Sequence, residues 1–139
     1  MPMAGKGIRL ADAGYEKPKP LVEVKNKSIM EWSIDSLNLD GTFIFCTKQE
    51  HIEKFEIDLK LREIITDCKI IPIKYDTRGT VDTILNAREL IDNDDELLIT
   101  DVDHYSEWDS DFFNNNIRKQ DIDGCTMVFP EPKTKSVCI

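Results

Sequence analysis

The chain has little of several residue types on which whole classes of protein depend. It contains two histidines and four cysteines in 139 residues, with no CxxC pair, so neither a zinc knuckle nor a thiol redox pair is indicated. Basic residues are also scarce: 18 stand against 27 acidic ones, which gives a net charge of −9 and a pI of about 4.7. This balance argues against general affinity for nucleic acid or for anionic membranes.

Long hydrophobic runs are absent as well. No apolar stretch reaches membrane length and no signal-peptide pattern opens the chain, so we expect a cytoplasmic, reducing setting. Cys46 and Cys125 fall within apolar runs and are expected to be buried thiols. The composition, 40% hydrophobic and 32% charged, is that of a globular chain, and we expect one domain over residues 1–139.

Short apolar segments rich in β-branched residues alternate with helical patterns along the chain. Strands are expected at 42–47, 69–73, 96–100 and 124–129, and helices at 28–37, 49–65, 80–91 and 109–120. Ser28 and Glu31 form a capping-box pattern at the start of the first of these helices. The alternation predicts an α/β fold of Rossmann-like type, with a mostly parallel sheet flanked by helices. In such sheets ligands bind beyond the carboxyl ends of the strands.

The opening segment is a local exception to the acidic balance. Lys6, Arg9, Lys17 and Lys19 all fall within the first 19 residues, around the glycine-rich stretch AGKGIRL. Glycines allow a backbone to approach a phosphate closely, and nearby basic side chains then supply charge. The stretch lacks the GK[ST] of a Walker loop and the third glycine of a dinucleotide fingerprint. It indicates either a site for a small anion or a simple solvated glycine turn.

A second candidate site follows the expected strand at 96–100. Asp101 and Asp103 stand two residues apart, so on an extended chain both side chains point to one side and face one cation. The alternative is a solvated acidic loop, which is what we expect of the acidic stretch at 92–96.

Four segments, in order along the chain, resemble one enzyme family. They are PMAGKGIRLADAGYEKPKPLVEV, NKSIMEWSIDSL, TRGTVDTIL and LLITDVDHY, and they are similar to the signature regions of the sugar-phosphate nucleotidyltransferases, also called NDP-sugar pyrophosphorylases. The resemblance implies transfer of a nucleoside monophosphate from an NTP to a sugar phosphate or a similar phosphorylated polyol, with release of pyrophosphate. The product would serve surface polysaccharide synthesis.

The resemblance also implies roles for particular residues. Arg9 and Lys19 correspond to the catalytic residues that stabilise charge on the phosphates, and Asp103 corresponds to the aspartate that holds a catalytic Mg²⁺. Asp101 is an additional carboxylate beside it. Nucleotide binding is implied for the opening loop and the nucleobase segment, at Met3, Ala4, Gly5, Lys6, Gly7, Gly79 and Thr80. Because the acceptor phosphate is already an anion, no general base is needed. Neither histidine is assigned a catalytic role: His51 lies on a charged helix and is expected to be solvated, and His104 is expected to line the pocket at most.

The chain departs from the family pattern in its length and in two details. Ile8 stands where the family usually has Ser or Thr, and only Met1 precedes Pro2 in the first strand. The family's catalytic domain is also much longer, so we expect an incomplete version of the fold, the nucleotide-binding part. An exposed sheet edge would then favour homo-oligomers. Two alternatives stay open: a glycosyltransferase with a DxD metal site, and a non-catalytic nucleotide-binding fragment that needs a partner.

Overall fold

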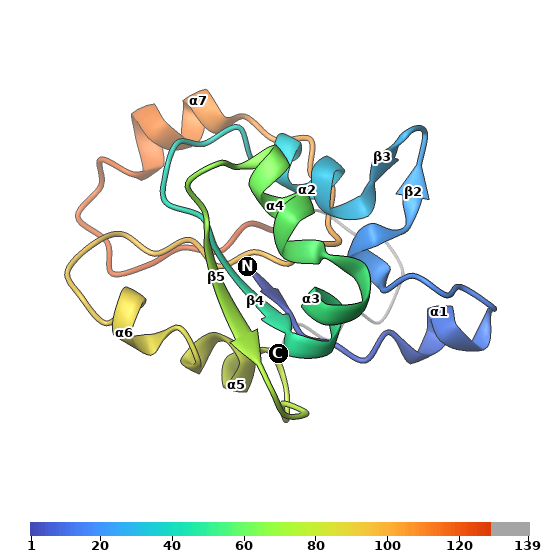
Figure 1. Ribbon diagram of the computed structural model, residues 1–139. Helices are drawn as coiled ribbons and strands as arrows, with labels where there is room; N and C mark the ends of the chain where they lie inside the picture. The colour runs from blue at the N-terminus through green and yellow to red at the C-terminus, as the bar shows by residue number, and fades with distance from the viewer. Residues whose placement is uncertain (129–139) are drawn as a thin grey trace. The chain divides into compact units, whose positions relative to one another are not determined.

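Three short parallel strands form the central sheet, in the order β1 (Pro2–Met3), β4 (Ile44–Lys48) and β5 (Lys69–Ile73). This computed structural model describes residues 1–128. Cys46 of β4 pairs with Pro2 on one side and with Ile71 on the other. Because all three strands run the same way, their carboxyl ends meet at one edge, as Figure 1 shows. The predicted α/β fold with a parallel sheet and flanking helices is confirmed.

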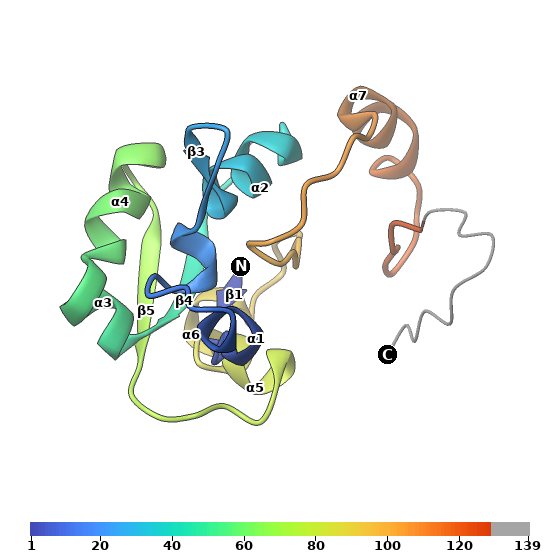
Figure 2. The ribbon, with the colours of Figure 1, turned by 90° about the vertical axis from the view of Figure 1, so that its right-hand side faces the viewer.

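Successive side chains of the strands lie on opposite faces of the sheet and pack in two separate hydrophobic clusters. Phe45 and Cys46, consecutive residues of β4, are 0% and 3% exposed and belong to different clusters. The larger cluster contains Met3, Leu21, Met30, Ile34, Phe45, Ile57, Leu61, Cys68 and Val102. The smaller one contains Ala4, Cys46, Ile73 and Ala87. Figure 2 shows the corresponding layers, with α3 and α4 on one side of β5 and α5 and α6 on the other.

Apart from the helix expected at 28–37, the helices are shorter than the sequence pattern predicts. They are α1 (Ile8–Asp12), the 3-10 turn η1 (Lys19–Leu21), α2 (Ile29–Leu37), α3 (Gln49–Phe55), α4 (Ile57–Ile64), α5 (Thr80–Leu85) and α6 (Arg88–Ile91). A small hairpin of β2 (Glu23–Val24) and β3 (Lys27–Ser28) precedes α2. The single helix expected at 49–65 is broken at Glu56, whose φ of 51° is left-handed and ends one helix where the next begins. No helix within residues 1–128 is long and apolar enough to cross a lipid bilayer.

The strand expected at 96–100 is not formed. Leu97, Leu98 and Ile99 are each about half exposed, at 52%, 51% and 53%, and the segment joins no ladder within the described residues. An apolar run becomes a strand only where a neighbouring strand accepts its hydrogen bonds. Burial resumes just after the segment, because Val102 is 4% exposed and packs in the larger core cluster.

The chain divides into two compact units, Met1–Trp108 and Asp109–Ile139. The second unit begins with α7 (Ser110–Phe112), which the Asp109 side chain caps, and continues as one π-helical turn, η2 (Phe113–Ile117). Residues 124–128 adopt no regular structure, and the last residue of the strand expected at 124–129 lies outside the described residues. Cys46 is buried as expected, whereas Cys125 is exposed.

Candidate functional site

The glycine-rich loop leaves the sheet at the carboxyl end of β1. Met3 and Ala4 are buried, at 5% and 4% exposure, so their side chains are not available to a ligand. Gly7 has a left-handed φ of 61° and accepts hydrogen bonds from the N–H groups of Leu10 and Ala11, at 3.0 and 3.1 Å. A side chain would be strained at this φ, which explains the glycine. The loop therefore turns sharply from β1 into α1.

The basic residues of the loop differ in their partners. Lys6 Nζ lies 2.9 Å from Asp76 Oδ2, and both side chains are 56% exposed. Arg9 is exposed on α1 and forms no ion pair within residues 1–128. Ile8, beside it, is 59% exposed and belongs to no core cluster. Arg9 is thus the basic residue of this loop that is free to meet an anion without first breaking a salt bridge.

Lys19 is held on a short turn by its neighbours. It opens η1 between Pro18 and Pro20, and Pro20 and Leu21 are buried beneath it. Its ammonium donates a hydrogen bond to Asp103 Oδ2, joining residues 84 apart in the sequence. The two side chains are 39% and 23% exposed. Two residues that the family resemblance assigns to one site therefore do meet in the folded chain.

Asp101, Asp103 and His104 form an acidic cluster at the same place. One ligand atom from each lies within 4.8 Å of the others, and His104 Nδ1 is 3.6 Å from Asp101 Oδ2. The two aspartates were expected to share a side through an extended strand. They share it instead through a turn at Val102 and Asp103, whose buried Val102 anchors it in the core.

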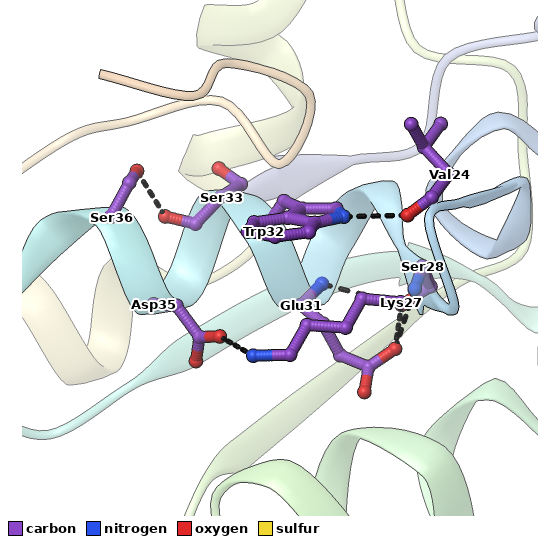
Figure 3. A network of polar contacts seen from close by, with 8 residues as sticks. All are labelled: Val24, Lys27, Ser28, Glu31, Trp32, Ser33, Asp35 and Ser36. Atoms are coloured by element: carbon purple, nitrogen blue, oxygen red, sulfur yellow. Dashed lines mark hydrogen bonds and ion pairs between the residues drawn. The ribbon is translucent and has the colours of Figure 1, made fainter. Parts of the chain in front are cut away.

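Helix α2 packs against this turn and forms a hydrogen bond with it. Ser33 is 1% exposed, and its hydroxyl donates to the Asp101 carbonyl over 2.9 Å. The predicted capping box fixes the start of the helix: the Ser28 hydroxyl accepts from the Glu31 N–H, and the Glu31 carboxylate accepts from the Ser28 N–H (Figure 3). Trp32 Nε1 also donates to the Val24 carbonyl at 2.8 Å, which ties the helix to the hairpin. The acidic turn therefore rests on a well-anchored element.

The donor set of this cluster fits a hard divalent cation. Carboxylate oxygens are the protein ligands that Mg²⁺ prefers, and Asp101 and Asp103 supply two of them. The Lys19 ammonium against Asp103 shows that this oxygen already stabilises positive charge. His104 is a less usual partner for Mg²⁺, since imidazole suits transition metals better. The fit thus rests on the two aspartates.

Gly79 and Thr80, which the family resemblance implies pack against the nucleobase, lie at the start of α5. Gly79 has an extended φ of 163°, a conformation open to any residue, so the backbone does not require glycine there. A Cβ at Gly79 would meet nothing within 4 Å, which leaves this surface open. Thr83 holds this segment in place: its hydroxyl forms hydrogen bonds with the Thr77 hydroxyl at 2.8 Å and with the Gly79 carbonyl at 3.1 Å. Thr80 is exposed beside it.

Three features differ from the sequence-based expectations or go beyond them. His104, which was expected at most to line the pocket, joins the acidic cluster directly after Asp103. Lys48 and Asp76 lie at and just after the ends of β4 and β5, where ligand-facing residues are expected in parallel sheets. The expectation of a solvated His51 was wrong: it is buried at 9% exposure, and this burial lowers the pKa of its imidazole.

The comparisons with known proteins agree on one family. A sequence model described as nucleotidyl transferase matches residues 3–136. Among solved structures, the chain is similar to the nucleoside-diphosphate-sugar pyrophosphorylase from Vibrio cholerae RC9, with 25% identity and a TM-score of 0.55. That match covers 64% of this chain and 39% of the pyrophosphorylase, so the chain spans well under half of that protein. No curated protein matches the chain.

Proposed function

Because the chain belongs to the nucleotidyl transferase family, we propose that it binds an NTP and transfers its nucleoside monophosphate to a phosphorylated sugar or polyol. The observation that carries the proposal is the contact between Lys19 and Asp103. It brings a phosphate-binding cation and a metal-binding carboxylate to one place, where the turn at Val102 also delivers Asp101. The family resemblance implies that both residues serve one reacting centre, and their contact across 84 residues supports that part of the proposal.

In the proposed reaction an oxygen of the acceptor phosphate attacks the α-phosphorus of the NTP. One P–O bond forms there, the bond to the bridging oxygen breaks, and pyrophosphate leaves with the electron pair. Charge grows on the leaving oxygens, so positioning and electrostatic stabilisation supply most of the rate enhancement. The acceptor is already an anion, and no side chain has to remove a proton.

In the proposed reaction the basic residues of this chain bind phosphate oxygens and the acidic residues bind the metal ion. Lys19 stabilises the phosphate oxygens at the reacting centre, and Arg9, which has no ion-pair partner among the described residues, meets the leaving pyrophosphate. The N–H groups of Gly5, Lys6 and Gly7 donate no hydrogen bond to the described part of the chain, so they can donate to the triphosphate. Asp103 and Asp101 would hold Mg²⁺, which offsets phosphate charge when bound.

The partners follow from this chemistry. An NTP and a phosphorylated sugar or polyol are the proposed substrates, and Mg²⁺ is the proposed cofactor. The product, an activated sugar or polyol, would serve the synthesis of a surface polysaccharide. The DxD glycosyltransferase alternative is less well supported, because the matched family transfers nucleotidyl groups.

The test is the exchange of labelled pyrophosphate into NTP, run with each NTP and a panel of sugar and polyol phosphates. The proposal expects exchange that requires Mg²⁺ and one acceptor phosphate and that is lost in Lys19→Ala. Calorimetric titration with each NTP–Mg²⁺ is run in parallel. No binding of any NTP would overturn the proposal.

The second candidate is a nucleotide-binding fragment without turnover. It is favoured by the share of the pyrophosphorylase that the chain spans, 39%. The same pair of measurements separates it from the first: binding with no exchange for any acceptor supports the fragment, and binding with exchange supports the enzyme.

A further inference from the structure

One carboxylate connects the loops that follow all three strands of the sheet. Asp76, three residues beyond β5, directs Oδ2 to Lys6 of the glycine-rich loop and Oδ1 to Lys48 at the end of β4, each over 2.9 Å. Lys48 also reaches Glu50 Oε1 at 3.3 Å. The expected phosphate loop is therefore attached to the rest of the sheet edge through Asp76.

The Lys48 end of this arrangement is fixed. Its side chain is only 11% exposed, and a cation so far from water is costly unless it is paired. Burial acts to lower the pKa of Lys48, but hydrogen bonds to Asp76 and Glu50 outweigh it, so the pKa is raised and the ammonium persists. Lys48 therefore holds Asp76 in place rather than the reverse.

The Lys6 end is exposed and contributes little to folding. Both side chains are 56% exposed, and surface ion pairs of this kind add about 0–1 kcal/mol to stability. Their effect is positional, because Lys6 lies between Gly5 and Gly7 in a segment with few other restraints. The pKa of Asp76 is lowered, first by Lys6 and then by Lys48, so the carboxylate stays charged at neutral pH.

We infer that Asp76 is a positioning residue of the site: it tethers Lys6, and with it the glycine-rich loop, in the place where a triphosphate is received. The inference rests on the proposed function. It assigns Asp76 no contact with substrate, since its two oxygens are already engaged by lysines. Preorganising a loop in this way strengthens binding by reducing the entropy lost when the ligand arrives.

The first test compares Asp76→Asn with the parent for binding of NTP–Mg²⁺ and for kinetics. Removing a negative charge near a triphosphate site should by itself tighten binding. The tether predicts the opposite, a Kd and KM raised roughly 2- to 5-fold with kcat less affected, because order is lost before the ligand binds. Asp76→Glu, which keeps the charge, should recover part of the loss. Unchanged or tighter binding in Asp76→Asn would overturn the inference.

Asp92→Asn is the matched control. Asp92 forms an exposed ion pair with Arg88 at 2.9 Å, so the substitution makes the same change in charge away from the site. It should leave the Kd for NTP at the parent value. An equal rise of the Kd in both variants would mean that an effect unrelated to the tether is responsible, and the inference would fall.

A double-mutant cycle asks whether Asp76 acts through Lys6. In the Lys6→Met background, Asp76→Asn should not weaken NTP binding further, because the ion pair between the two residues is already absent. Lys48→Met should resemble Asp76→Asn if it still folds, which a thermal unfolding curve checks. If the two substitutions weakened NTP binding additively, Asp76 would not act through Lys6, which contradicts the inference.

A measurement without nucleotide separates this inference from the proposed function. Backbone ¹⁵N order parameters of Gly5, Lys6 and Gly7 in the ligand-free chain should fall in Asp76→Asn and stay unchanged in Asp92→Asn. If the parent binds no NTP, the proposed function fails and the positioning role falls with it. If the parent binds NTP but neither the order parameters nor the Kd change in Asp76→Asn, the proposed function stands and this inference is wrong.

Discussion

Two lysine–aspartate pairs, Lys19 with Asp103 and Lys6 with Asp76, are built differently. Lys19 stands on a proline-flanked turn over a buried leucine, and its partner Asp103 is 23% exposed. Lys6 stands between glycines, and its partner Asp76 is 56% exposed. The first pair places a charge rigidly, whereas the second restrains a loop that can still adjust. In the proposed site, burial and the neighbouring residues, more than the pairing itself, would distinguish the reacting group from the positioning one.

Breaking the rigid pair should have the largest effect. Lys19→Ala should weaken NTP binding by about 1.5–3 kcal/mol, the value of a charge-assisted hydrogen bond to phosphate, without unfolding the chain, since Lys19 belongs to no core cluster. Calorimetric titration measures the affinity and thermal unfolding checks the fold. Lys17→Ala is the control, because Lys17 is exposed and pairs with Glu23. Unchanged affinity in Lys19→Ala would remove this residue from the site.

The two aspartates of the acidic cluster should respond unequally. Asp103→Asn should lower Mg²⁺-dependent NTP binding about tenfold, or roughly 1.4 kcal/mol, and Asp101→Asn should lower it less, because Asp101 is the more exposed at 44%. Mg²⁺ is titrated against NTP binding in both variants. A greater loss at Asp101 would reverse their assigned roles.

A third prediction concerns the pH dependence of stability and the buried His51, three residues after Lys48. Burial first, and the charge of Lys48 in lesser part, lower the pKa of its imidazole from 6.5. Above pH 6.5 the ring is neutral in both folded and unfolded chains. As the pH falls below that value the unfolded chain binds a proton first, so the free energy of unfolding decreases until the folded pKa is passed.

His51→Phe should flatten this pH dependence while keeping the aromatic contact with Phe55. Urea unfolding between pH 7.5 and pH 5 gives the free energy of unfolding for both proteins. An equally steep loss in the variant would show that other groups cause it.

The smallest effect is expected from the adjustable loop. Ile8→Ser replaces an exposed isoleucine, at 59%, with a hydroxyl beside the proposed phosphate site. A net gain of about 0.5–1.5 kcal/mol in NTP affinity is expected, as for one hydrogen bond, with no loss of stability. Unchanged affinity would show that position 8 faces away from the phosphates.

The family and the sheet could be predicted from the sequence because their signals are local. The β-branched run at 69–73 became β5 with the predicted bounds, and the capping box at Ser28 formed as predicted. The family expectation is confirmed by the match over residues 3–136. For the site, the sequence could suggest Lys19 and Asp103 individually, but their contact across 84 residues depends on tertiary packing.

The failures have a different physical origin. Leu97, Leu98 and Ile99 carry a strand pattern, but a strand needs a partner, and apolar composition does not supply one. Glu56 gives no sequence signal for the left-handed turn that divides the helix expected at 49–65, because a glutamate at positive φ is uncommon. Asp76 looked like one of many surface acids, and only the fold shows that it bridges two lysines.

The contact between Lys19 and Asp103 has a consequence for the order in which ligands arrive. Before binding, each residue neutralises the other. A free triphosphate that drew Lys19 away would leave Asp103 facing a polyanion, and a free cation on Asp103 would repel Lys19. The NTP–Mg²⁺ complex would satisfy both residues in one event, because its cation would replace Lys19 beside Asp103 and its phosphates would replace Asp103 beside Lys19. In the proposed reaction, this pair would therefore select for the complete NTP–Mg²⁺ complex and bind the free nucleotide or the free cation only weakly.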